Sequence, residues 1–143
     1  MPEEDFKHLI IKRYKYWTVY LHGNQGYLGR MYVWLNREGD IDYFLGTMVA
    51  ERVEFDQIAR ELWGALTTLF SPDRANWGAL SNEAPHCHVH LVPRYLSDRA
   101  FAGLTFIDKD PKKNWLTDKS LEFSLETLET IRAAIAEELE RAT

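Results

Sequence analysis

Apolar residues and histidines alternate along residues 86–91 of the chain. Alternation with a period of two is typical of a β-strand that buries one of its faces. Successive side chains of a strand point to opposite faces, so the three histidines are expected to share one face. The apolar residues between and after them are expected to face the core. The histidines are His86, His88 and His90, and the apolar residues are Cys87, Val89 and Leu91.

Residues 17–21 and 30–35 are also rich in strand-forming residues, and the turn-like segment 22–26 lies between them. This arrangement predicts an antiparallel hairpin. Residues 76–80 predict a further strand, and the short connection 81–85 predicts that it pairs antiparallel with the histidine strand. Segment 41–49 is predicted to be a short strand or an irregular link.

Apolar residues spaced three or four positions apart predict two helices, at residues 51–70 and at about 124–141. Ser124 is a suitable N-cap for the second helix. Segment 101–118 is predicted to be mostly loop with a short strand at 104–107, and to cover a site or meet a partner subunit. The first helix is expected to bury a stripe formed by Val53, Ile58, Leu62, Leu66 and Leu69.

These elements predict one α+β domain over residues 1–143, in which helices pack on an antiparallel, meandering sheet. The formal net charge of −5 argues against non-specific binding to nucleic acid or to an anionic membrane. The single cysteine fits a reducing compartment, and the acidic start lacks the apolar stretch of a signal peptide. We therefore expect a cytoplasmic protein.

A row of imidazoles supports two kinds of chemistry. Neutral histidine is a common zinc ligand, and it is also a nucleophile and proton donor near neutral pH. The sequence holds neither His-Glu-x-x-His nor Cys-x-x-Cys, and Cys87 is expected to point away from the histidines. The spacing therefore favours catalysis over metal binding.

The motif His-x-His-x-His-x-x-Pro-Arg-Tyr, which begins at His86, resembles the signature of the histidine triad family. The resemblance extends to Asn82-Glu83 and, more weakly, to residues 24–30. It implies a nucleotide hydrolase of the small bacterial or archaeal diadenosine-polyphosphate hydrolase-like type, with the fold of that family. It also implies a homodimer that requires no cofactor beyond magnesium carried by the substrate.

The resemblance implies a role for each residue of the motif. His88 would attack the α-phosphate and form a nucleotidyl-histidine intermediate, His90 would donate a proton to the leaving group, and His86 would position His88. The residues expected to bind the substrate are Asn82 at the α-phosphate, and His22 and Asn24 at the ribose. Possible residues of the base pocket are Phe6, Tyr16 and Tyr27, and Arg94 and Arg99 are cations that could meet a distal phosphate. Arg94 could equally pair with an acid in a structural role.

Two departures from the family pattern leave alternatives open. Glu38 stands where the family carries a further histidine, and it is either a carboxylate that orients His86 or an exposed turn residue. Glu83 and Ala84 stand where a phosphate-binding hydroxyl is common. The alternatives are a nucleoside phosphoramidase, a nucleotidyl transferase, or a module that binds nucleotide or metal with little turnover.

Overall fold

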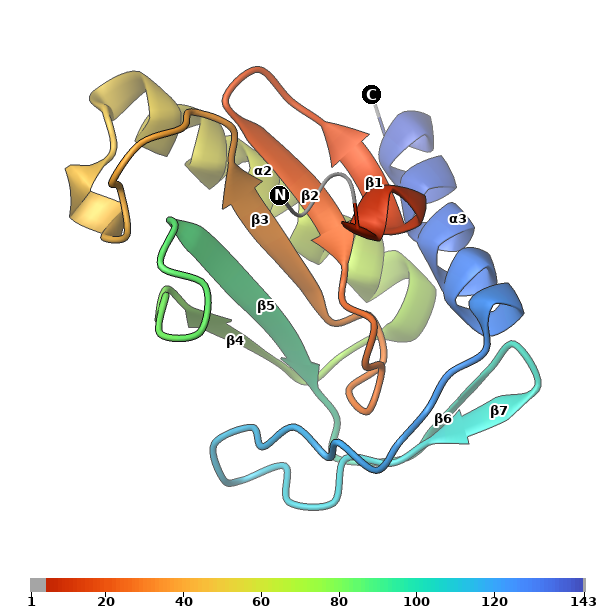
Figure 1. Cartoon of the computed structure of the whole chain (residues 1–143). Helices are drawn as coiled ribbons and strands as arrows, with labels where there is room; N and C mark the ends of the chain where they lie inside the picture. Colours follow the sequence, from red (N-terminus) through yellow and green to blue (C-terminus); the bar gives the residue numbers. More distant parts are fainter. Residues whose placement is uncertain (1–4, 143) are drawn as a thin grey trace.

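A five-stranded antiparallel sheet forms the centre of the computed structural model, which describes residues 5–142 (Figure 1). Its strand order is β1-β2-β3-β5-β4, so β5 lies between β3 and β4. The predicted hairpin of β2 and β3 and the predicted pairing of β4 with β5 are both confirmed. The strands are β1 (Ile10–Arg13), β2 (Trp17–Leu21), β3 (Met31–Leu35), β4 (Arg74–Gly78) and β5 (His88–Arg94).

Two helices, α2 (Val49–Phe70) and α3 (Leu125–Arg141), contribute to the same hydrophobic core as the sheet. Alternate side chains of a strand point to one face, and in β3 every second residue is buried, namely Met31, Val33 and Leu35. Cys87, Val89 and Leu91 are at most 4% exposed, as their positions predicted. The helices therefore cover one face of the sheet, and the opposite face carries His88 and His90.

The predicted stripe of α2 is correct only for part of the helix. Ile58, Leu62 and Leu66 are fully buried, whereas Val53 is 65% exposed. The prediction for Val53 was wrong because the first turns of α2 bury only Glu51, and the helix enters the core from Ile58 onward. No helix within residues 5–142 is long and apolar enough to span a membrane.

The remaining elements are short. The 3-10 helices η1 (Lys7–Leu9) and η2 (Phe44–Gly46) flank the first three strands, and η2 makes segment 41–49 an irregular link. Strands β6 (Arg99–Phe101) and β7 (Leu104–Phe106) form a separate two-stranded sheet. Ser124 caps α3 by accepting a hydrogen bond from the backbone N–H of Thr127, as predicted.

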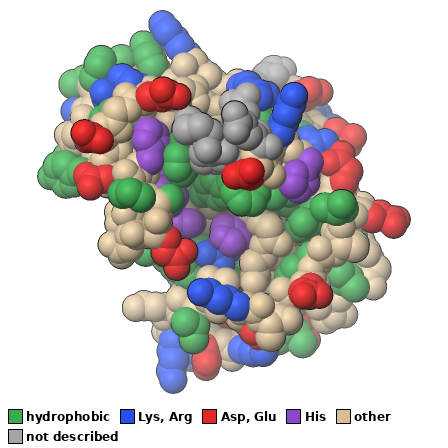
Figure 2. Space-filling view, in the orientation of Figure 1, with side chains coloured by type: hydrophobic (Ala, Val, Ile, Leu, Met, Phe, Trp, Pro, Cys, Tyr) green, Lys and Arg blue, Asp and Glu red, His purple; other side chains and the backbone are tan. Residues whose placement is uncertain are grey.

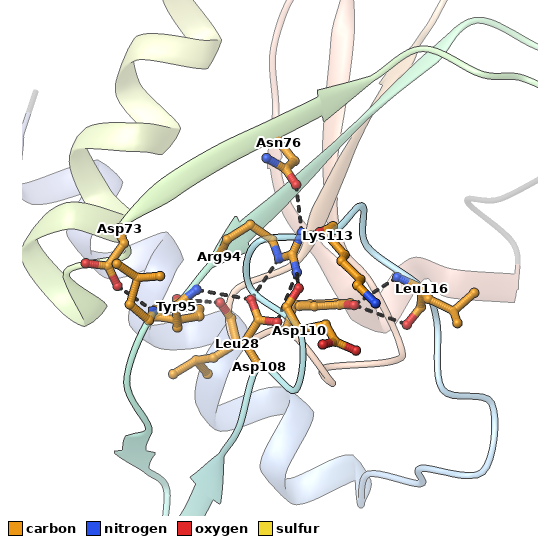
Figure 3. A network of polar contacts seen from close by, with 11 residues as sticks. Leu28, Asp73, Asn76, Arg94, Tyr95, Asp108, Asp110, Lys113 and Leu116 are labelled. Carbon is orange, nitrogen blue, oxygen red and sulfur yellow. Dashed lines mark hydrogen bonds and ion pairs between the residues drawn. The ribbon is translucent and has the colours of Figure 1, made fainter.

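Segment 107–123 runs across the end of β5, and hydrogen bonds from Arg94 hold it there (Figure 3). Arg94 is 2% exposed, and its guanidinium pairs with the carboxylate of Asp108 at 2.7 Å. It also donates to the backbone carbonyls of Asp110 and Lys113. Arg94 therefore has a structural role, which decides between the two roles that its position in the motif allowed.

Candidate active site

The three histidines of the motif lie together against the aromatic side chains of β3. The indole ring of Trp34 stacks on the ring of His86 at 4.6 Å and on that of His88 at 5.3 Å, measured between centroids. The rings of His88 and His90 are 4.9 Å apart and nearly perpendicular. This arrangement follows from the strand register, which pairs Trp34 with His88 and Tyr32 with His90. The predicted common face is therefore confirmed, although His86 precedes the first residue of β5.

Backbone carbonyls fix the protonation of two of these rings. Nδ1 of His88 lies 2.7 Å from the carbonyl oxygen of His86, and Nε2 of His86 lies 2.7 Å from that of Leu35. A carbonyl oxygen only accepts hydrogen bonds, so the ring nitrogen must carry the proton in each case. In neutral His88 the other nitrogen, Nε2, then holds an unprotonated lone pair. The carbonyl of His86 thus fixes the tautomer of His88 whose Nε2 is free to accept a proton or to attack an electrophile.

Burial lowers the pKa of three histidines at this site, His22, His88 and His90, and so favours their neutral form. It lowers the pKa of His90 to about 4, with further contributions from His88 and the cation of Arg30. It lowers the pKa of His22 to about 3, with contributions from Arg30 and His90. The pKa of His88 is also lowered, mainly by burial. A neutral imidazole is the form that can attack phosphorus.

These shifts predict that the protein loses stability as the pH falls from 7 to 5. The unfolded chain takes up protons at its histidines near pH 6.5, while His22 and His90 remain neutral in the folded protein. The stabilisation is therefore complete above pH 6.5 and is lost toward pH 4. We expect a loss on the order of 2 kcal/mol at pH 5, because one pKa unit corresponds to about 1.4 kcal/mol and partial solvent access reduces the sum.

Urea unfolding at pH 7 and pH 5 measures this loss. The double variant His22→Gln, His90→Gln should lose much less stability over the same interval, because glutamine does not titrate. An equal loss in the variant and in the unaltered protein would show that other groups cause the pH dependence.

Two cavities open on either side of the histidine row, and Figure 2 shows histidine side chains at the floor of a hollow on this face. One has a volume of about 570 Å³ and includes the basic residues Arg30 and Lys119 in its lining. The other, of about 500 Å³, is lined by apolar and aromatic residues from the start of the chain and from β3. These residues are Phe6, Leu9, Tyr32 and Trp34. His22, His88 and His90 line both cavities, so the two form one site with a cationic lobe and an aromatic lobe.

The expected substrate-binding residues all line the cationic lobe. Asn82 lies there on the exposed connection between β4 and β5. His22 accepts a hydrogen bond at Nδ1 from the backbone N–H of Asn24, at 2.9 Å. The side chain of Asn24 itself bonds the backbone of Gly26 and Asp118, so its amide holds two loops together.

The structure assigns most of the other candidates to other places. Glu38 is exposed and forms no hydrogen bond with any residue from 5 to 142, and the carbonyl of Leu35 bonds the ring of His86 in its place. Arg99 bonds carbonyls at the end of α2. Phe6 lines the aromatic lobe, whereas Tyr27 lines a neighbouring cavity beyond the site.

Sequence reasoning missed several residues that line the site. Trp34, Tyr32 and Arg30 occupy alternate positions, so the period-two pattern of the strand could have placed them on the histidine face. Trp115 carries no comparable signal. It reaches the site because its ring packs on Gly78, where a Cβ atom would lie 2.6 Å from the indole.

The site shows no ready-made metal centre. Within residues 5–142, no group of three His, Cys, Asp or Glu side chains is arranged to hold a metal ion. The ring proton of His86 is already directed at a backbone carbonyl.

Solved structures with this fold come from several bacteria. A histidine triad protein from Bradyrhizobium japonicum is 18% identical and superposes with a TM-score of 0.73, over 94% of each chain. A histidine triad protein from Sinorhizobium meliloti is 18% identical with a TM-score of 0.74, over 94% of this chain and 93% of the other. A Zn-bound histidine triad family protein from Mycobacterium smegmatis is 17% identical with a TM-score of 0.61, over 94% and 88%.

No protein-family model matches the sequence, and no curated protein matches it closely enough to count as a relative. At these identities the superpositions establish the architecture alone. They agree with the motif that begins at His86, whose three histidines lie at the centre of the site. The chain therefore has the fold of the histidine triad proteins.

Proposed function

We propose that this protein is a histidine triad hydrolase that cleaves nucleotide conjugates of the diadenosine-polyphosphate type at the α-phosphate. The observation that carries the proposal is the hydrogen bond from Nδ1 of His88 to the carbonyl of His86. This bond leaves the Nε2 lone pair of a buried, neutral imidazole as the attacking group. Covalent catalysis of this kind replaces one difficult displacement at an anionic phosphate with two easier steps.

In the first step, Nε2 of His88 would form a bond to the α-phosphorus while the bond to the leaving oxygen breaks. The leaving group would take the bonding electron pair, and His90 would supply a proton to it. The negative charge of the bound phosphates favours the protonated form of His90, because an adjacent anion raises the pKa of an imidazole. In the second step, water would attack phosphorus and give a proton to His90, and the bond between phosphorus and Nε2 of His88 would break with its electron pair returning to Nε2. A nucleoside monophosphate would be released, and both histidines would regain their starting states.

The aromatic lobe supports a nucleoside as the other part of the substrate. Phe6 lines this lobe and is 45% exposed, and Tyr32 and Trp34 line the lobe from the face of the sheet. Rings of this kind stack on a nucleobase, which has a flat apolar face. Asn82 lines the opposite lobe, where its amide would donate a hydrogen bond to an oxygen of the α-phosphate.

The test is a quantitative assay of AMP release from diadenosine tetraphosphate and from an adenosine phosphoramidate. The proposal expects AMP to accumulate with turnover from diadenosine tetraphosphate. AMP from the phosphoramidate alone would favour the alternative, a nucleoside phosphoramidase. Nucleotide binding by calorimetry without AMP release from either compound would contradict it, and would favour a nucleotide-binding module.

A further inference from the structure

Arg30 is a buried cation without a counter-charge. Its residue is 4% exposed, its NH1 group donates to the hydroxyl of Thr117 at 2.8 Å, and its Nε atom is buried with no hydrogen-bond partner. No Asp or Glu within residues 5–142 forms an ion pair with it. The equally buried Arg94, by contrast, is matched by the carboxylate of Asp108. Burying an unpaired charge costs several kcal/mol, so an anion is the missing partner of Arg30.

The strand register places Arg30 on the leaving-group side of the histidine row. Arg30 comes two residues before Tyr32, which pairs with His90, and four before Trp34, which pairs with His88. The order along this face is therefore His88, His90 and then Arg30. The buried amide of Gln25 donates to the carbonyl of Arg30 at 2.9 Å, and so holds the start of β3 in this position.

The cationic charge is confined to one lobe of the site. Arg30 and Lys119 line the lobe that also holds Thr117 and Trp115. The aromatic lobe is lined by Asp5 and, within residues 5–142, by no lysine or arginine, whereas Glu83 lines both lobes. An anionic group in the site is therefore drawn to the Arg30 side, and an uncharged base to the other.

We propose that Arg30, with Lys119, forms a subsite for a negatively charged leaving group, and that it makes phosphoanhydrides better substrates than conjugates with a neutral amine. This inference rests on the proposed attack by His88. In an in-line displacement the leaving group departs opposite Nε2 of His88, on the side of His90 and Arg30. As the bond between phosphorus and oxygen breaks, the leaving phosphate gains negative charge, and a guanidinium can bind it through two hydrogen bonds.

The first experiment compares kcat/KM for diadenosine tetraphosphate and an adenosine phosphoramidate in Arg30→Gln. In the variant, kcat/KM should fall about 100-fold for the polyphosphate, as when other hydrogen-bond donors to a transition state are removed. For the phosphoramidate it should fall less than about threefold. Arg60→Gln removes the same charge from the exposed face of α2 and should change neither value. Equal losses on both substrates, or no loss on either, would overturn the inference.

A second experiment is independent of turnover and uses pyrophosphate as the probe. Pyrophosphate at about 100 times its dissociation constant should stabilise the unaltered protein by about 2.7 kcal/mol against urea. Arg30→Gln should remove this stabilisation, Arg30→Lys should keep part of it, and Arg60→Gln should keep all of it. If neither nucleotide is hydrolysed, the proposed function fails, yet Arg30-dependent binding of pyrophosphate would still support the subsite. Absence of binding at millimolar pyrophosphate would overturn it, whether or not Arg30→Gln folds.

Discussion

Replacement of His88 by alanine is expected to lower kcat for AMP release by about 10⁴-fold to 10⁶-fold, the range seen when a covalent nucleophile is removed. The reason is that Nε2 of His88 carries the lone pair that attacks phosphorus, because the hydrogen bond to the carbonyl of His86 keeps the proton on Nδ1. The loss is measured by steady-state AMP release from diadenosine tetraphosphate. His90→Ala should lose less, about 10²-fold to 10⁴-fold, because water can replace a proton donor but not the nucleophile.

The matched control is His8→Ala. His8 is an exposed histidine on η1 and lies outside both lobes of the site, so kcat should stay within twofold. Because His88 is only 7% exposed, its variant must also be compared with the unaltered protein in urea unfolding. A folded His88→Ala protein that kept more than a tenth of kcat would show that another group attacks phosphorus.

Replacement of Arg94 by leucine is expected to lower the free energy of unfolding by about 3–5 kcal/mol, the cost of breaking a buried ion pair from one side. The change leaves the carboxylate of Asp108, whose side chain is 1% exposed, without its cation. It also leaves the backbone carbonyls of Asp110 and Lys113 without their donor. Urea unfolding at pH 7 measures the loss.

Activity should fall in Arg94→Leu as well, because segment 107–123 carries Trp115 and Thr117 into the site. The matched control is Arg60→Ala, which breaks an exposed pair with Asp56 and should cost less than about 1 kcal/mol. If Arg94→Leu were no less stable than Arg60→Ala, the pair with Asp108 would contribute nothing to holding the segment.

Local patterns in the sequence were sufficient to predict the sheet that carries the histidines. The period-two alternation from His86 predicted the common face and the buried positions of Cys87 and Val89, and both are confirmed. The turn-like segment 22–26 and the short connection 81–85 predicted antiparallel neighbours for the same reason, since short links join only such strands.

The exposed Val53 shows the limit of these patterns. Helical periodicity defines which residues share a stripe, but it does not define where along the helix the sheet begins to cover that stripe. That limit depends on how far α2 extends beyond its neighbours in space, which is a property of the whole fold. The stripe of α2 is therefore correct from Ile58 onward and wrong before it.

Of the site itself, only the row of histidines could be predicted from the sequence. His88 and His90 lie on β5 and His86 comes just before it, so one stretch of sequence contains all three histidines. The cationic lobe, by contrast, joins Arg30, just before β3, with Thr117 and Lys119 from a segment far along the chain. That segment lies there because Arg94 bonds Asp108 and the carbonyls beyond it. The sequence does not show which carboxylate an arginine of a motif will pair with. Neither the ion pair between Arg94 and Asp108 nor the cationic lobe could therefore be predicted from it.

The most direct test of the proposed mechanism is mass spectrometry of the intact protein, quenched shortly after mixing with diadenosine tetraphosphate or an adenosine phosphoramidate. We expect a transient gain of one adenylyl group on the unaltered protein, carried by the peptide that contains His88. His88→Ala should show no such gain. AMP release without an adduct at any time, or an equal adduct on His88→Ala, would contradict attack by His88.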